Sequence, residues 1–180
     1  MVTSGSYPIG PETGTLRLRT HRQGAASRAG HDLLIEVTRW SGTVEVDAEN
    51  PDRSRVEVTA DPTSFDVLEG TGGLKPLTDK DRGEIKETAA TKILDAARHP
   101  EITFASTAVS ATGDEATVRG DLTVRGTSRP TEVRATVADT RVTAVATVVQ
   151  TEFGIKPYTA FLGALKLRDD VDVQVELTLQ

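Results

Sequence analysis

The stretch "ITFASTAVSATGDEATVRGDLTV" (residues 102–124) decides the fold of this chain. Apolar side chains alternate with polar ones on both sides of a Gly113-Asp114 pair. Because successive side chains of a strand point to opposite faces, this alternation is typical of strands with one buried face. A Gly-Asp pair between two such runs indicates a tight turn. The stretch therefore predicts a β-hairpin.

The same alternation recurs along the rest of the chain. Further runs lie at residues 15–19, 33–37, 44–46, 56–60, 133–137, 142–148 and 171–179. Turn sequences separate several of them, such as ENPDR (49–53) and ADTR (138–141). Short connections favour antiparallel pairing. We therefore expect an all-β fold of about eight antiparallel strands closed into a barrel, because closure removes exposed strand edges. A sandwich of two sheets would carry the same pattern.

One segment breaks the strand pattern and predicts an α-helix near residues 79–97. Thr78 stands three residues before Asp81, which is an N-cap arrangement. His99-Pro100 ends the segment, because the residue before proline is pushed out of the helical region. Apolar residues recur at helical spacing between these limits: Ile85, Ala89, Ile93 and Ala96. The helix must bury this stripe, so we expect it to cover the open mouth or wall of the barrel.

The length and composition of the chain fit one globular domain. The chain has 180 residues, of which 37% are hydrophobic and 27% charged. Residues 1–12 contain Gly, Ser and Pro without periodicity, so we expect a flexible N-terminal lead-in before a single domain at residues 13–180.

Charge and composition exclude several classes of function. The net charge is -6 and the basic residues are scattered, so nucleic acid is not an expected partner. No run approaches the roughly 18 apolar residues of a membrane span, and no leader pattern opens the chain. The chain has no cysteine, which fits a reducing compartment. We therefore expect a cytoplasmic protein that has no membrane span and no cofactor.

Two groups of polar residues are candidates for chemistry. His31 shares strand parity with Leu33 and Ile35, so its ring should point inward at the end of a strand, where it could meet a ligand headgroup or satisfy a backbone carbonyl. We favour the structural role, in which His31 bonds a backbone carbonyl. Asp79 and Asp81 could form an acid and base pair, but carboxylates in a first helical turn already have a capping role. The three histidines have no partner at ligand spacing, so no metal site is predicted.

Four segments resemble the signature sequences of the YceI-like family. They are "SRVEVTADPTSFDV" (54–67), "PEITFAST" (100–107), "VRGDLTVRG" (118–126) with Pro130 after it, and "QTEFGI" (150–155). The resemblance implies a lipocalin-like barrel of eight antiparallel strands, with a long apolar cavity that holds an isoprenoid or similar amphiphile, often in a dimer. It implies no catalytic residues.

The chain also departs from the pattern of that family. "DKDRGEIKETAATKIL" (79–94) stands where the family usually has an Asp-x-His-Leu segment, while "GHDL" occupies residues 30–33. These differences indicate a variant "GHDL" branch.

Three functions are compatible with these residues. The first is a carrier for an isoprenoid or fatty amphiphile, in which His31 and Lys75 meet the headgroup. The second is an enzyme at the barrel mouth that uses His31 with Asp32, Asp79 or Asp81, and the third is a filled barrel that binds a partner or has a structural role. We favour the carrier over the enzyme. Since only 4% of residues are aromatic, the barrel should keep a slender void. The predicted apolar ligand-binding residues are Leu16, Leu18, Leu33, Ile35, Phe65, Phe104, Phe153 and Phe161.

Overall fold

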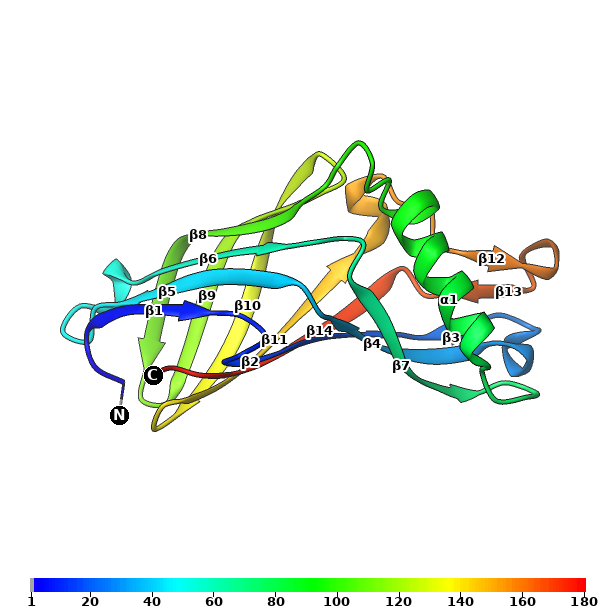
Figure 1. Ribbon diagram of the computed structural model, residues 1–180. Helices are drawn as coiled ribbons and strands as arrows, with labels where there is room; N and C mark the ends of the chain where they lie inside the picture. Colours follow the sequence, from blue (N-terminus) through cyan, green and yellow to red (C-terminus); the bar gives the residue numbers. More distant parts are fainter. Residues whose placement is uncertain (1) are drawn as a thin grey trace.

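The fold is a curled antiparallel sheet, as the computed structural model of residues 2–180 shows (Figure 1). Eleven strands pair in the order β1-β5-β6-β8-β9-β10-β11-β14-β2-β4-β7. The strands are β1 (Gly5–Ile9), β2 (Gly14–Thr20), β3 (Arg22–Gln23), β4 (His31–Val37), β5 (Trp40–Val46), β6 (Arg55–Ala60), β7 (Phe65–Gly72), β8 (Ile102–Thr112), β9 (Glu115–Val124), β10 (Thr127–Ala138), β11 (Arg141–Val149), β12 (Thr159–Ala160), β13 (Leu165–Leu167) and β14 (Asp170–Thr178). The predicted antiparallel, lipocalin-like barrel architecture is confirmed. The predicted turns at Gly113-Asp114 and ADTR are also confirmed, since they join β8 to β9 and β10 to β11.

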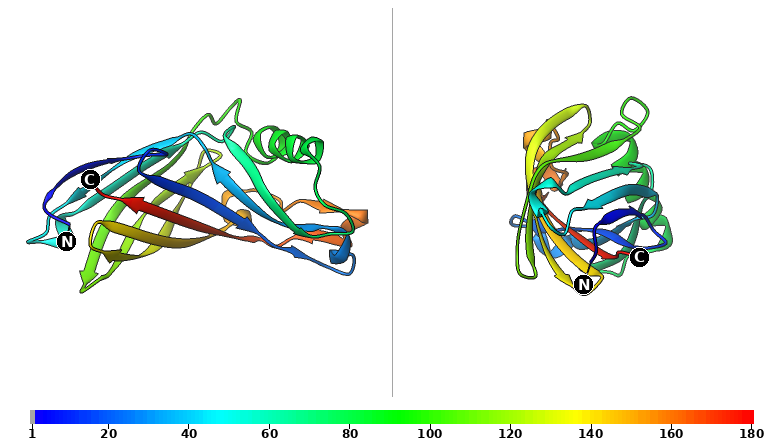
Figure 2. Two further views of the ribbon diagram at one scale, coloured as in Figure 1. Left: turned by 60° about the horizontal axis from the view of Figure 1, so that its bottom comes forward. Right: turned by 90° about the vertical axis from the view of Figure 1, so that its left-hand side faces the viewer.

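Two long strands bend together and curl the sheet. β4 continues into β5 across residues 38–39, and β6 continues into β7 across residues 61–64. Hydrogen bonds join the two bends: Thr38 N donates to Ser64 O, and Asp61 N donates to Arg39 O. These two bent strands form a two-stranded ribbon. Its β4 segment pairs with β2, and its β6 segment pairs with β8. Figure 2 shows the sheet wrapped round in this way.

The strand count differs from the predicted eight for two reasons. Each bent strand is counted as two in the sheet order, and β1 adds one more strand beside β5. β1 lies inside residues 1–12, the predicted lead-in, and its five residues all pair with β5 from Gly5 opposite Val46 to Ile9 opposite Gly42. Strand pairing therefore orders a segment that lacks periodicity, and its description as flexible is wrong for residues 5–9.

The predicted helix is present but shorter. α1 runs over Asp79–Thr88, a π-helical turn η3 follows at Ala89–Ile93, and the helical backbone ends there instead of near residue 97. The predicted N-cap at its start is confirmed, because Thr78 Oγ1 accepts from Asp81 N at 3.2 Å. Asp81 Oδ2 also accepts from Thr78 N at 2.8 Å, which completes a capping box. Short 3-10 turns lie elsewhere, at η1 (Ser27–Ala29), η2 (Pro51–Arg53), η4 (Gln150–Phe153) and η5 (Phe161–Gly163).

α1 lies along β7, the last strand of the sheet, and shields its edge (Figure 1). The guanidinium of Arg82 donates to the carbonyl oxygens of Val67 at 2.8 Å and Leu68 at 2.5 Å. Lys86 Nζ pairs with Asp66 Oδ1 at 2.5 Å. A helix that occupies the backbone groups of an edge strand prevents further strand addition there.

A second, three-stranded sheet of β12, β13 and β3 extends the molecule at the end where α1 begins (Figure 1). Most of the buried core lies in the main sheet. One cluster includes Ile9, Val37 and Trp40, and Val37 is 2% exposed. A smaller cluster of Leu94 and Phe153 packs beneath the η3 turn. These clusters leave the middle of the curled sheet unfilled.

Candidate ligand-binding cavity

A large cavity runs through the inside of the curled sheet. Its volume is about 1510 Å³. Small-molecule pockets usually measure roughly 300–1,000 Å³, so this cavity is larger than a typical site for one compact ligand. The structure therefore contradicts the hypothesis of a filled barrel.

The inward face of each strand explains why the space stays open. β10 presents Val133, Ala135 and Val137 to the cavity, and β11 presents Ala144 and Ala146. On β10 these short side chains alternate with the outward polar residues Arg134 and Thr136, as the sequence pattern predicts. Because alanine and valine fill little volume, the facing walls do not meet across the centre.

Most of the predicted ligand-binding residues line this cavity. They are Leu16, Leu18, His31, Leu33, Ile35, Phe65, Lys75 and Phe104. Phe153 and Phe161 do not line it. Phe153 is 3% exposed and packs against Leu94, while Phe161 is 65% exposed at the tip of the β12–β13 hairpin. The sequence pattern could not separate them, because neither lies in a long alternating run.

The sequence analysis missed two polar groups of the cavity wall. Thr20 ends the inward series Leu16, Leu18, Thr20 on β2, and it is 9% exposed. Its hydroxyl is buried and has no hydrogen-bond partner within residues 2–180. Gln150 also lines the cavity, with its amide nitrogen donating to Arg168 O at 3.0 Å. The alternation along β2 could have identified Thr20 as inward-facing, because it has the same parity as Leu16 and Leu18. Gln150 lies in a 3-10 turn and had no such signal.

His31 occupies the structural role that the sequence favours. Its Nε2 lies 2.8 Å from the carbonyl oxygen of Lys75, which holds the loop of residues 73–78 over the end of β4. Gly73 makes this approach possible: its φ is +73°, and a Cβ on it would lie 2.2 Å from His31 Nε2. Only glycine fits both the backbone angle and the space.

The nearby carboxylates are engaged in local structure. Asp81 caps α1, and the hydrogen bonds from Thr78 lower the pKa of its carboxyl group. Asp32 Oδ1 accepts from the backbone N–H of Arg22 at 2.7 Å. None of the hydrogen bonds within residues 2–180 joins His31 to a carboxylate. The geometry of an acid and base pair is therefore not formed at this end of the barrel.

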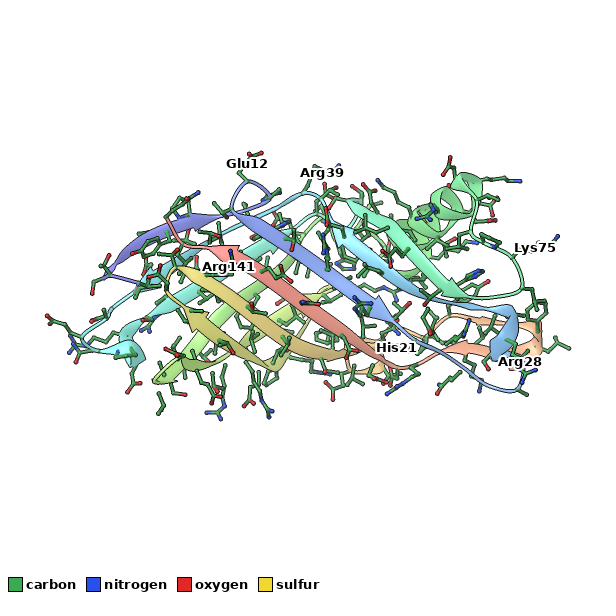
Figure 3. All side chains as sticks on the ribbon, turned by 90° about the horizontal axis from the view of Figure 1, so that it is seen from below. Glu12, His21, Arg28, Arg39, Lys75 and Arg141 are labelled. Carbon is green, nitrogen blue, oxygen red and sulfur yellow. The ribbon has the colours of Figure 1, made fainter. Side chains whose placement is uncertain are left out.

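A histidine–carboxylate pair does exist on the outer face. His21 Nε2 lies 2.8 Å from Asp172 Oδ2, and neither residue lines the cavity. The alternation of β14 places Asp172 opposite to Val171 and Val173, which point inward. Figure 3 shows His21 on the side of the barrel. The pair joins the end of β2 to β14 and has no access to the cavity.

Within residues 2–180, no group of three or more His, Asp or Glu side chains is arranged to hold a metal ion. No helix in this part of the chain is long and apolar enough to cross a membrane.

A sequence model of the YceI-like domain matches residues 12–179. This chain belongs to the YceI-like family. Among curated YceI-like relatives, it is 33% identical over 96 residues to Protein YceI of Escherichia coli, across 53% of this chain and 44% of that protein. It is 35% identical over 98 residues to a UPF0312 protein of Pseudomonas savastanoi, across 54% of this chain and 45% of the relative. Each match therefore spans less than half the length of the relative.

Solved structures share the YceI-like fold. BcnA of Burkholderia cenocepacia is similar with a TM-score of 0.67 and 21% identity, covering 92% of this chain and 96% of BcnA. A polyisoprenoid binding domain from Saccharophagus degradans, described as implicated in plant cell wall breakdown, is similar with a TM-score of 0.59 and 10% identity, covering 99% of this chain and all of that domain. At these identities the likeness establishes the shared fold.

Proposed function

We propose that this protein binds and carries a long-chain isoprenoid or other amphiphilic lipid in the barrel cavity. The observation that supports this most directly is the cavity of about 1510 Å³ with its aliphatic walls. The polyisoprenoid binding domain with the same fold is consistent with it. Each buried methylene contributes about 0.8 kcal/mol, so a chain of about ten carbons gains substantial affinity without specific polar contacts.

The polar groups of the cavity suggest where the headgroup lies. His31, Lys75 and Lys166 line the cavity at the end near α1, together with Tyr158. The walls between the two ends of the barrel are mainly Val, Ala, Leu and Ile side chains. The opposite end of the cavity is lined by the carboxylates Asp47, Asp114 and Asp139, whereas the basic groups lie at the end near α1. A ligand with an apolar chain and a neutral or anionic headgroup at the end near α1 matches this distribution. His31 and Lys75 therefore remain our predicted headgroup contacts.

The enzymatic alternative has less support. It needs a base beside an orienting carboxylate, but His31 contacts the carbonyl oxygen of Lys75 and Asp81 caps a helix. Binding without chemistry requires only the cavity. A carrier thus accounts for the arrangement with fewer assumptions.

Native mass spectrometry before and after organic extraction tests the proposal. Purified protein should carry added mass that extraction removes, and extracted protein should take up farnesol. Ala135→Phe places a large ring in the cavity, so its uptake should fall, whereas Ala138→Phe on the exposed face of β10 should bind as the parent does. A parent protein that carries no added mass and ignores every offered lipid would overturn the carrier function.

A further inference from the structure

Three loops meet at the end of the molecule where α1 begins, and we define this end as the tip (Figures 1 and 2). They comprise residues 24–30, 73–78 and 161–164. Ala26 N donates to Ala164 O at 2.9 Å, and His31, next to the first loop, bonds Lys75 O in the second. The tip is therefore one connected surface.

The tip exposes large apolar side chains. Leu74 is 81% exposed, Phe161 is 65% exposed, and Leu162 is fully exposed. Tyr158 adds a ring that is 48% exposed near the same hairpin. Only two other large apolar residues of the described chain are exposed, Leu68 and Val145. Apolar side chains that gather in this way, instead of being scattered singly, mark an interaction surface.

The backbone of the hairpin adds a second observation. Phe161 and Leu162 have φ values of 49° and 56°, in the left-handed region that bulky residues rarely adopt. Consecutive residues in this conformation form the tip of the β12–β13 hairpin. The chain thus keeps two bulky apolar residues exposed at a position where glycine or asparagine would be less strained.

Cations accompany these apolar side chains. Arg28, Lys75 and Lys166 are exposed, and none of them has a salt bridge within residues 2–180. Figure 3 places Arg28 and Lys75 together at the tip and Arg141 toward the other end.

Most acidic groups near the tip already have partners. Asp32 lies by Arg22, and Glu84 lies by Lys80. Asp81 is bonded to Thr78, and Asp79 stands in the first turn of α1, where the helix dipole favours a negative charge. The loops themselves therefore present positive charge, although the whole chain carries a net charge of -6.

We propose that the tip docks on the surface of an anionic phospholipid bilayer. Leu74, Phe161 and Leu162 enter the boundary between headgroups and acyl chains, while the cations meet the phosphates. Leu74 and Lys75 also line the cavity, so docking brings the cavity mouth against the bilayer. A lipid could then pass between bilayer and cavity without crossing water.

A second copy of this chain is the main alternative partner for the tip. A two-fold interface brings the same patch of both copies together. Arg28, Lys75 and Lys166 of both copies would then be gathered at one interface, and this concentration of positive charge is unfavourable. Charge complementarity therefore favours an anionic surface.

Vesicle co-sedimentation tests the proposal. The full chain should sediment with vesicles of phosphatidylcholine and phosphatidylglycerol, bind pure phosphatidylcholine vesicles weakly, and dissociate as salt is raised. Leu162→Asp should lower binding roughly tenfold, because it places a charge where an apolar side chain inserts. Arg28→Glu and Lys75→Glu should each lower it at least about fivefold.

The matched controls lie away from the tip. Val145→Asp changes an exposed apolar residue of β11, and Arg141→Glu reverses an exposed cation with no salt bridge in the described chain, so both should bind vesicles as the parent does. Ala135→Phe should also bind vesicles normally, because the surface does not depend on an occupied cavity. This result separates the docking proposal from the carrier proposal.

Three results would overturn the docking proposal. The first is a parent protein that ignores anionic vesicles, and the second is control variants that weaken binding as much as the tip variants do. The third is a parent dimer that Leu162→Asp converts to a monomer while vesicles bind neither form, which would make the tip a self-association surface.

Discussion

The imidazole Nε2 of His31 lies 2.8 Å from the carbonyl oxygen of Lys75, and this contact joins the first residue of β4 to the loop that borders the cavity mouth. Gly73 packs directly over the ring with a positive φ, so the loop follows a path that only glycine allows. His31 is therefore an anchor for the loop of residues 73–78 and for the two cavity-lining residues Leu74 and Lys75.

Replacing His31 by Phe should loosen this loop. The ring volume is largely retained, but the hydrogen bond to Lys75 O is lost, so we expect the free energy of unfolding to fall by about 1 kcal/mol. Amide hydrogen exchange in residues 73–78 should become faster. His21→Phe, on the outer face, should leave exchange in this loop unchanged. Equal protection of the loop in His31→Phe and the parent would contradict the anchoring role.

Ser64 fixes the bend of the two long strands. It is fully buried, and its hydroxyl accepts from Arg39 N at 3.1 Å and donates to Asp61 O at 2.8 Å. Ser64→Ala leaves the backbone N–H of Arg39 without this partner, which should cost about 1–3 kcal/mol of stability in denaturant unfolding. Ser41→Ala, on an exposed position of β5, should change stability by less than about 0.5 kcal/mol. Similar losses in the two variants would argue against a specific role of Ser64.

Asp61 should make stability depend on acid pH. Its hydrogen bonds with Thr63, together with the Arg39 guanidinium, hold the pKa of this carboxyl below its ordinary value of 3.8. A lowered native pKa means that the unfolded chain binds the proton more readily than the folded protein does. The ionised Asp61 carboxyl therefore stabilises the fold fully above pH 3.8, and this stabilisation is lost as pH falls through the lower native pKa. Urea unfolding across this acidic range should show a shallower pH dependence for Asp61→Asn. Identical slopes in parent and variant would rule out this contribution.

Strand parity and turn chemistry were enough to predict most of the barrel. Alternation in residues 102–124 and 171–179 placed β8, β9 and β14, and the Thr78–Asp81 spacing placed the start of α1. These signals are local, since side-chain direction and helix capping depend on neighbouring residues. The inward residues of the long strands, such as Leu16 and Ile35, were predicted to face the cavity for the same reason, and they do.

The differences arise where distant contacts decide the structure. β1 is a strand because it pairs with β5, far along the chain, and its own sequence has no alternation. Phe161 lies outside the cavity because the β12–β13 hairpin extends beyond it, and no local pattern reports the length of that extension. The helix ends early in a π-helical turn, in which Leu94 N donates to Ala89 O. Helical spacing of apolar residues does not distinguish such a turn from regular α-helix.

Thr20 offers a test of where the polar end of the ligand lies. Its hydroxyl is buried in the cavity wall and lacks a hydrogen-bond partner in the described chain, which is costly unless a ligand supplies one. Thr20→Val replaces the hydroxyl by a methyl group of similar size, so the empty protein should be as stable as the parent or more stable by about 1 kcal/mol. Binding of farnesol should weaken about fivefold, whereas binding of the hydrocarbon farnesene should not change. Thr15→Val, whose side chain does not line the cavity, is the control on the same strand. If Thr20→Val bound both probes as the parent does, the polar end of the ligand would not contact Thr20.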